Sequence, residues 1–343
     1  MSKTSTDLCR YALNGPTMSA RWSALFFTEQ TFDAKHVCSA LQAAVTEIDD
    51  QMSAWKPDSD LMRINRAPVG DWIEAPARLM DVLRLGLAVG RASGGTFDVG
   101  LGDAVTAWGF GPEAAAGDRI RVAMEAKRRP AWEALDVEAG RLRKCQPVTL
   151  DFNGIAKGYG VDRLAETLAG FGITSFLAGI DGEMRATGLR PDDEPWTIAI
   201  EQPDHARRAV HSVLALHDAA VATSGDYRHW VDVRGRRLSH TMDPGRGAPL
   251  PAPPASVTVV APTCAEADAW ATALMVAGPE AGVALAERHA LDALFLLRDD
   301  AGGIRPQPVG RLFSGGTAAT AEPSENETWT RHRLIDSRHS CSP

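Results

Sequence analysis

The ten residues 151–160, with the sequence DFNGIAKGYG, combine the features of an anion-binding corner. We expect a short strand to end at Asp151 and a helix to begin near Ile155. The glycines would let a ligand approach the backbone, the helix N-terminus would favour negative charge, and Lys157 would add a cation. The spacing fits neither a Walker A loop nor a GxGxxG motif. A strand–turn–helix corner with an exposed lysine would give the same pattern, so both interpretations stay open.

A second segment, 263–274 (TCAEADAWATAL), places a carboxylate and a hydroxyl at helical spacing. Thr263 and Glu266 form a capping box, which fixes the start of a helix. Asp268 and Thr272 lie four residues apart and therefore share one helix face. Two hard oxygen ligands of this kind suit Mg²⁺ better than zinc. An aspartate near a helix N-terminus is also favourable without any metal, so this pattern does not decide between the two.

Residues 221–227 (VATSGDY) and 239–247 (SHTMDPGRG) contain a candidate base. The ordinary pKa of histidine lies near neutrality, so His240 could accept a proton from a hydroxyl nucleophile. Ser224 lacks the GxSxG elbow, and an esterase-type triad is therefore poorly supported. The Asp-Pro-Gly sequence forms a turn whatever its neighbours do, so a purely structural His240 is the alternative.

Aromatic residues lie among six glycines in residues 94–111 (GGTFDVGLGDAVTAWGFG). Phe97, Trp108 and Phe110, together with Asp98, could line a slot for a flat ring. A glycine-rich core loop would look the same in sequence.

Apolar periodicity indicates the elements that must position these residues. Strand-forming residues predict a strand over 17–27, and apolar residues three and four apart predict a helix from Val37 to Met52. A polar loop follows, and Pro76 would open a second helix. Helices and strands mix without a regular βαβ order, so the predicted fold class is α+β. Further strands are expected at 175–178, 196–201, 212–216, 220–223, 256–261 and 293–297, and two helices before the last strand. The helix that begins near Ile155 would carry Val161, Leu164, Leu168 and Phe171, and Gly172 would end it.

Charge and composition exclude several functions. The formal net charge is −8, and no block of Lys or Arg forms a basic stripe, so we expect no nucleic-acid partner. The five cysteines are scattered without a CxxC pair and offer no zinc site. No apolar run predicts a signal peptide or a membrane span of ~18 residues. The sequence as written predicts a cytoplasmic protein, and a periplasmic one only if an upstream start was missed.

The order of these segments resembles that of the FAD:protein FMN transferases, the ApbE-like flavin transferases. The resemblance extends from about Met18 to Leu297. It rests on Thr17-Met18, on SAWKPDS at 53–59, on Asn65, on Phe97-Asp98, on Trp108-Gly109-Phe110-Gly111 and on the later segments DFNGIAKGY, TSGDY, SHTMDPGRG and DAWATA. It implies a single T-fold-related α+β domain, with a mixed sheet and flanking helices, over residues 17–313. Residues 1–16 would be an N-terminal extension and 314–343 a flexible tail.

The resemblance also implies a reaction and a site. Such enzymes use Mg²⁺ and FAD to transfer FMN onto a Thr or Ser hydroxyl of a target protein, and they release AMP. His240 would be the base, with Asp226 as a second candidate. The metal ligands would be Asp268, Thr272 and the carbonyl of Gly154. The flavin would contact Met18, Trp55, Thr96, Phe97, Asp98, Asp151, Lys157 and Met242.

Three positions depart from the family pattern: Ser19 and Asp181 replace glycines, and Trp55 replaces a tyrosine. The expected partner is a flavin-acceptor protein with a D-x-x-[ST]-x-A-[ST]-like motif. Two other functions remain open from sequence: a Mg-dependent FAD pyrophosphatase that yields FMN and AMP, and a non-catalytic flavin-binding assembly protein. The presence of Asp268, Thr272 and His240 argues against the last.

Overall fold

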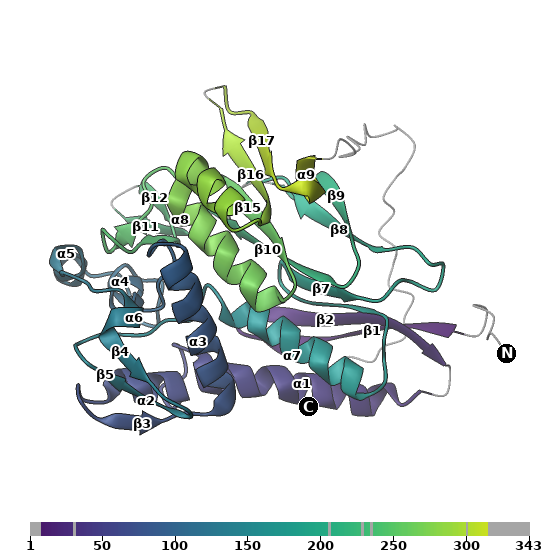
Figure 1. Ribbon diagram of the computed structural model, residues 1–343, viewed down its shortest axis with the longest axis horizontal. Coiled ribbons are helices and arrows are strands. Elements are labelled where there is room, and N and C mark those ends of the chain that lie inside the picture. The colour runs from purple at the N-terminus through teal and green to yellow at the C-terminus, as the bar shows by residue number, and fades with distance from the viewer. Residues whose placement is uncertain are drawn as a thin grey trace.

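The computed structural model describes residues 8–29, 32–204, 207–227, 230–233, 236–299 and 301–314. Residues 1–7 of the expected extension and 315–343 of the expected tail lie outside these ranges. An eight-stranded sheet runs through the centre of the domain (Figure 1). Its strands, in spatial order, are β1 (Leu8–Thr17), β2 (Ala20–Glu29), β6 (Phe176–Ile180), β7 (Glu183–Thr187), β10 (Ala219–Gly225), β15 (Ser256–Ala261), β16 (Asp292–Arg298) and β17 (Ile304–Val309).

The α+β single-domain prediction is confirmed, with one difference in the sheet. Every neighbouring pair in the central sheet is antiparallel, so this sheet is not mixed. The strand predicted at 17–27 is present as β2 from Ala20 onward, but its predicted start is wrong, because β1 and β2 form a hairpin that turns at Met18 and Ser19. Both turn residues have positive φ, +45° and +57°, as a two-residue hairpin loop requires. Residues 8–16, which were expected to belong to an N-terminal extension, are therefore part of strand β1 in the sheet.

Three long helices cover one face of the sheet: α1 (Ala34–Met52), α7 (Ala156–Gly170) and α8 (Cys264–Arg288) (Figure 1). The predicted apolar stripe of α1 is buried, from Val37 to Met52. The predicted stop of α7 is also confirmed, because Gly172 adopts a φ of +77° just beyond the helix end. The two helices expected before the last strand are one element, α8, broken at Gly278 (φ +78°) before Pro279.

The opposite face of the sheet is covered by a two-stranded ribbon, β8 (Trp196–Glu201) and β9 (Val210–Leu216). Alternate residues of both strands point inward, as period-two burial requires. Trp196 and Leu214 belong to this second core, which also contains Val221 of β10 and Leu296 of β16. The central sheet is thus buried on both faces.

Most of the remaining elements form a lobe at one end of the sheet (Figure 1). The loop predicted after α1 contains a short helix, α2 (Asp60–Arg66), that the sequence pattern did not predict. Ser59 caps this helix by accepting the N–H of Met62. Pro76 lies one residue before the next helix rather than at its first position. The lobe consists of α2, β3 (Trp72–Glu74), α3 (Ala77–Ala92), α4 (Gly102–Ala107), α5 (Gly117–Glu125), α6 (Ala131–Ala134), β4 (Leu135–Val137) and β5 (Arg141–Lys144). The other elements are β11 (Trp230–Val233), β12 (Arg236–Ser239), β13 (Met242–Asp243), β14 (Ala248–Pro249) and α9 (Arg311–Ser314).

By length and hydropathy alone, helix α8 would also pass as a membrane span. Half of its most apolar window is nevertheless buried within the described structure. This is the pattern of a core helix, because α8 packs on α3, α7, β10 and β15.

The contact between α7 and α8 fixes the position of both helices. A Cβ atom on Gly158 would lie 2.3 Å from the carbonyl oxygen of Cys264, so only glycine allows this approach. Next along α7, the buried carboxylate of Asp162 accepts the N–H groups of Cys264 and Ala265, each at 2.9 Å. It also pairs with Arg185 of β7 at 2.5 Å. Asp162 therefore joins the N-terminus of α8, helix α7 and the sheet.

We expect Asp162→Ala to lower the free energy of unfolding by about 3 kcal/mol, because it leaves a cation and two buried N–H groups without their partner. Urea unfolding followed by circular dichroism would measure the loss. Glu166→Ala, which removes an exposed carboxylate from the same helix, should cost less than about 1 kcal/mol. Equal losses for the two variants would contradict this role of Asp162.

Candidate active site

A cavity of about 1150 Å³ lies between the central sheet, the β8–β9 ribbon and the helical lobe. It exceeds the roughly 300–1,000 Å³ of most small-molecule pockets and can hold a ligand as long as a dinucleotide. Its walls come from segments far apart in the chain, among them the β1–β2 turn, the residues before and at the start of α7, the β6–β7 turn, β10 and α8. All the predicted site residues except Asp226 line it.

The three predicted metal-binding positions lie together on one wall. Asp268 and Thr272 occupy successive turns of the same face of α8, whose capping box is present: Thr263 accepts the N–H of Glu266. A Cβ atom on Gly154 would lie 3.1 Å from Thr272 Oγ1, so the hydroxyl sits against the Gly154 backbone. Asp268 Oδ2 accepts the N–H of Gly158 at 3.0 Å. The Gly154 backbone, the Thr272 hydroxyl and the Asp268 carboxylate therefore share this wall.

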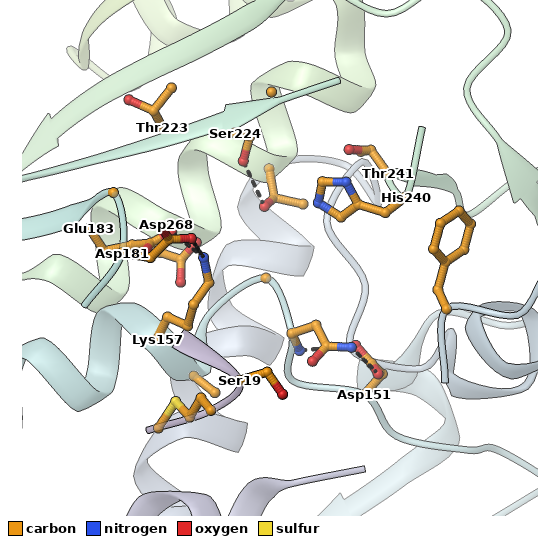
Figure 2. Close-up of a pocket in the computed structure, with 18 of the residues that line it drawn as sticks. Ser19, Asp151, Lys157, Asp181, Glu183, Thr223, Ser224, His240, Thr241 and Asp268 are labelled. Carbon is orange, nitrogen blue, oxygen red and sulfur yellow. Dashed lines mark hydrogen bonds and ion pairs between the residues drawn. The ribbon is translucent and has the colours of Figure 1, made fainter. Parts of the chain in front are cut away.

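Beside this wall, Lys157 pairs with a buried carboxylate and lies near a second, half-exposed one (Figure 2). Lys157 Nζ lies 2.7 Å from Glu183 Oε1 and 3.8 Å from the half-exposed Asp181. Burial alone would lower the pKa of Lys157, but the charges of Glu183 and Asp268 raise it above its usual range. Burial raises the pKa of Asp268, and the charge of Glu183 raises it further. When Asp268 and Glu183 are both ionised, their two negative charges exceed the single positive charge of Lys157, which favours an additional cation.

The residues predicted to hold the flavin lie along the rest of the cavity. Phe97 is buried, whereas the ring of Trp55 is 56% exposed at the rim. The carboxylate of Asp98 accepts the N–H groups of Gly100 and Ala131, so it holds the surrounding loop in place. Met18 lines the cavity from the β1–β2 turn. The positive φ of Met18 and Ser19 is strain of a kind that recurs at binding sites.

Asp151 lies just before the α7 corner, and its environment alters its acidity. Its carboxylate accepts the backbone N–H and the side-chain amide of Asn153, each at 2.9 Å. Exclusion of water raises the pKa of Asp151 to about 6, against the opposing effect of the Asn153 N–H. The alternative interpretation of this corner, a strand–turn–helix with an exposed lysine, is wrong, since Lys157 pairs with Glu183 inside the cavity.

The structure separates the two candidate bases. The ring of His240 faces the cavity from the side opposite Lys157 and Glu183 (Figure 2). It contacts the ring of Phe110 edge-on, with 6.4 Å between centroids. Asp226 instead forms a two-point ion pair with Arg298, at 2.6 and 2.8 Å. Because this pairing occupies both carboxylate oxygens and Asp226 does not line the cavity, the structure gives no support to Asp226 as the base.

Two of the cavity residues that were not predicted to belong to the site, Glu183 and Ser224, contact predicted site residues. Glu183 was not among the predicted site residues, yet its side chain is buried and its Oε2 atom has no hydrogen-bond partner among the described residues. Ser224 was considered only as a nucleophile, yet its Oγ lies 3.2 Å from Thr272 Oγ1. The available signal for Glu183 was the pair of carboxylates after the apolar run FLAGI, with Asp181 directly after the run and Glu183 two residues later. The Ser224 contact depends on tertiary packing and had no such signal.

Fold and site together define a class: a single α+β domain that encloses a dinucleotide-sized cavity lined with hard oxygen ligands. The sequence model of the ApbE family matches residues 18–295. An FAD:protein FMN transferase of Vibrio cholerae serotype O1 is 36% identical over 295 residues, 84% of this chain and 88% of that protein. This chain therefore belongs to the ApbE family.

Solved structures agree with this assignment. The apo form of Pseudomonas stutzeri flavinyl transferase ApbE aligns with a TM-score of 0.79 at 34% identity, covering 92% of this chain and all of that one. The flavin transferase ApbE from Vibrio cholerae aligns with a TM-score of 0.78 at 32% identity, covering 88% and 97%.

The raised pKa of Asp151 predicts how stability depends on pH. The folded pKa of about 6 exceeds the unfolded value of about 3.9, so the folded state binds the proton more tightly and loses stability as pH rises through this window. Asp151→Asn stays neutral throughout. Its Tm should match the wild type near pH 4 and exceed it by a few degrees at pH 8.

Thermal unfolding at several pH values would test this, with the exposed Asp71→Asn as the control. A Tm difference that does not change with pH, or an equal effect of Asp71→Asn, would show that Asp151 has no such linkage.

Proposed function

We propose that this chain transfers FMN from FAD to a Thr or Ser hydroxyl of a target protein and releases AMP, with Mg²⁺ in the site. One observation carries the proposal. A single dinucleotide-sized cavity brings together a cluster of hard oxygen ligands, a paired lysine and, across from them, a histidine. The names of the relatives, FAD:protein FMN transferase and flavin transferase, support the same reaction.

The residues present fit a magnesium ion. Asp268, Thr272 and the Gly154 carbonyl would supply hard oxygen ligands, which Mg²⁺ prefers, and substrate phosphates and water commonly complete such a site. The unbalanced charge of buried Asp268 and Glu183 would be offset by a cation. No group of three His, Cys, Asp or Glu side chains is placed to hold a metal in the described part of the chain, which agrees with a ligand set that has only one carboxylate.

The chemistry requires little covalent help from the protein. The acceptor oxygen forms a bond to the FMN-side phosphorus, the diphosphate P–O bond breaks, and AMP leaves with the bridging oxygen. His240 takes the proton of the hydroxyl. When bound, Mg²⁺ stabilises the charge that develops on the phosphoryl oxygens. The apolar walls and the paired Lys157 hold the cofactor in place, and positioning of this kind supplies much of the rate in phosphoryl transfer.

An FAD pyrophosphatase would use the same groups with water in place of the acceptor hydroxyl. The geometry does not favour water over a protein hydroxyl, and the relatives' names favour transfer. The deciding experiment mixes the protein, FAD and Mg²⁺ with a target that contains a D-x-x-[ST]-x-A-[ST] segment. In-gel flavin fluorescence on the target is the expected result. Free FMN and AMP without a labelled target would establish the hydrolase instead.

We expect Asp268→Ala to reduce FMN transfer by more than about 100-fold while the fold survives, because one charged ligand is lost and the helix stays packed. Flavin fluorescence on the target measures transfer, and circular dichroism checks the fold. The exposed Glu280→Ala, on the same helix, should retain activity. Wild-type turnover by Asp268→Ala would exclude this metal site.

His240→Asn should lower kcat for transfer by about 10²–10⁴-fold while FAD binding changes little, because a positioned base acts on the reacting proton. Single-turnover flavin labelling and FAD titration would separate the two quantities. His217→Asn, an exposed histidine outside the cavity, is the matched control. A parallel loss of FAD affinity would assign His240 to flavin orientation instead.

A further inference from the structure

Ser224 and Thr272 meet where strand β10 passes under helix α8. Alternate residues of β10 face the helix: Ala222 packs against Ala267 of α8, and Ser224, two residues further on, lies on the same face. Its Oγ is 3.2 Å from Thr272 Oγ1 (Figure 2). The intervening Thr223 points the other way and bonds Thr258 of β15 at 2.8 Å. Strand β10 thus places the Ser224 hydroxyl against the face of α8 that carries Asp268.

The Thr272 hydroxyl has two possible arrangements within a helix. A helical threonine can turn its hydroxyl back to the carbonyl of the residue four positions earlier, here Asp268. The hydrogen bond that the structure contains goes to Ser224 instead. With this rotamer, Oγ1 lies against Gly154, where a Cβ atom would approach it to 3.1 Å. The contact with Ser224 therefore goes with the orientation in which Oγ1 lies against the Gly154 backbone.

The direction of this hydrogen bond also matters. A hydroxyl has one proton and two acceptor lone pairs, and a cation needs a lone pair. If Ser224 donated to Thr272, one lone pair would be consumed. If Thr272 donates to Ser224, both lone pairs of Oγ1 remain for the site.

We propose that Ser224 is a positioning residue for the metal site: it accepts the proton of the Thr272 hydroxyl and so directs the lone pairs of Oγ1 toward the cation. The inference rests on the metal site of the proposed function. Ser224 does not contact the cation; it acts through Thr272.

The test measures metal affinity directly, with Mn²⁺ as the probe and the free ion followed by electron paramagnetic resonance, with and without FAD. Ser224→Ala should weaken Mn²⁺ binding by about 10–100-fold, the usual effect of removing a group that orients a ligand. Ser224→Thr keeps the hydroxyl and should restore binding to near the wild-type value. Thr223→Val, which removes the neighbouring hydroxyl of the same strand, is the matched control and should bind like the wild type.

A double-mutant cycle identifies the route of the effect. In a Thr272→Val background, Ser224→Ala should cause no further loss of Mn²⁺ affinity, since Ser224 acts through the missing hydroxyl. The same additional loss in both backgrounds would overturn the proposal, as would wild-type affinity in Ser224→Ala or no Mn²⁺ binding by the wild type. Activity supplies a second readout: excess Mg²⁺ should restore transfer by Ser224→Ala, and a structural defect would not respond to it.

The outcomes also separate this inference from the proposed function. A wild-type protein that binds Mn²⁺ through Thr272 and Ser224 but releases only free FMN would exclude transfer and leave the role of Ser224 intact. A wild type that labels its target, with a Ser224→Ala variant of unchanged Mn²⁺ affinity, would exclude the role of Ser224 alone.

Discussion

The close approach of α7 to α8 is the contact on which the site depends. At Gly158 there is no space for a side chain against the Cys264 carbonyl, and Asp268 accepts the Gly158 N–H in the same place. This brings the corner at 151–160 against the first turns of α8. Gly154 and Lys157 belong to one segment and Asp268 to another more than a hundred residues further along the chain, and this contact makes them neighbours. Asp162 of α7 stabilises the same contact, because it accepts two N–H groups at the N-terminus of α8.

Burial then determines the electrostatics of the site. Glu183 and Asp268 are removed from water, where an unpaired carboxylate is costly, and they share Lys157. The protein accepts this cost beside the cavity, where a cation would offset it. Lys157 is therefore paired with the carboxylates of Glu183 and Asp181. Its contribution to binding an anionic ligand depends on how the negative charge of these carboxylates is balanced.

The departures from the family pattern have different structural consequences. Ser19 occupies a left-handed turn position that glycine would adopt without strain, at a cost of about 1 kcal/mol for a residue with a Cβ. Asp181 likewise has a positive φ, +54°, and its carboxylate adds to the charge around Lys157. Trp55 keeps an aromatic surface at the exposed rim of the cavity.

The sequence by itself determined whatever depends on local periodicity and short-range chemistry. The helix over Val37–Met52, the capping box at Thr263 and Glu266, the Gly172 stop and the pairing of Asp268 with Thr272 on one face all follow from spacing along the chain. Only the tertiary structure decided which of the candidate groups meet. The β1–β2 turn inside a predicted strand, the diversion of Asp226 to Arg298, the burial of Glu183 and the contact of Ser224 with Thr272 depend on which faces of distant elements pack together. That packing is fixed by the volume and burial of the whole core, and a local sequence pattern does not contain it.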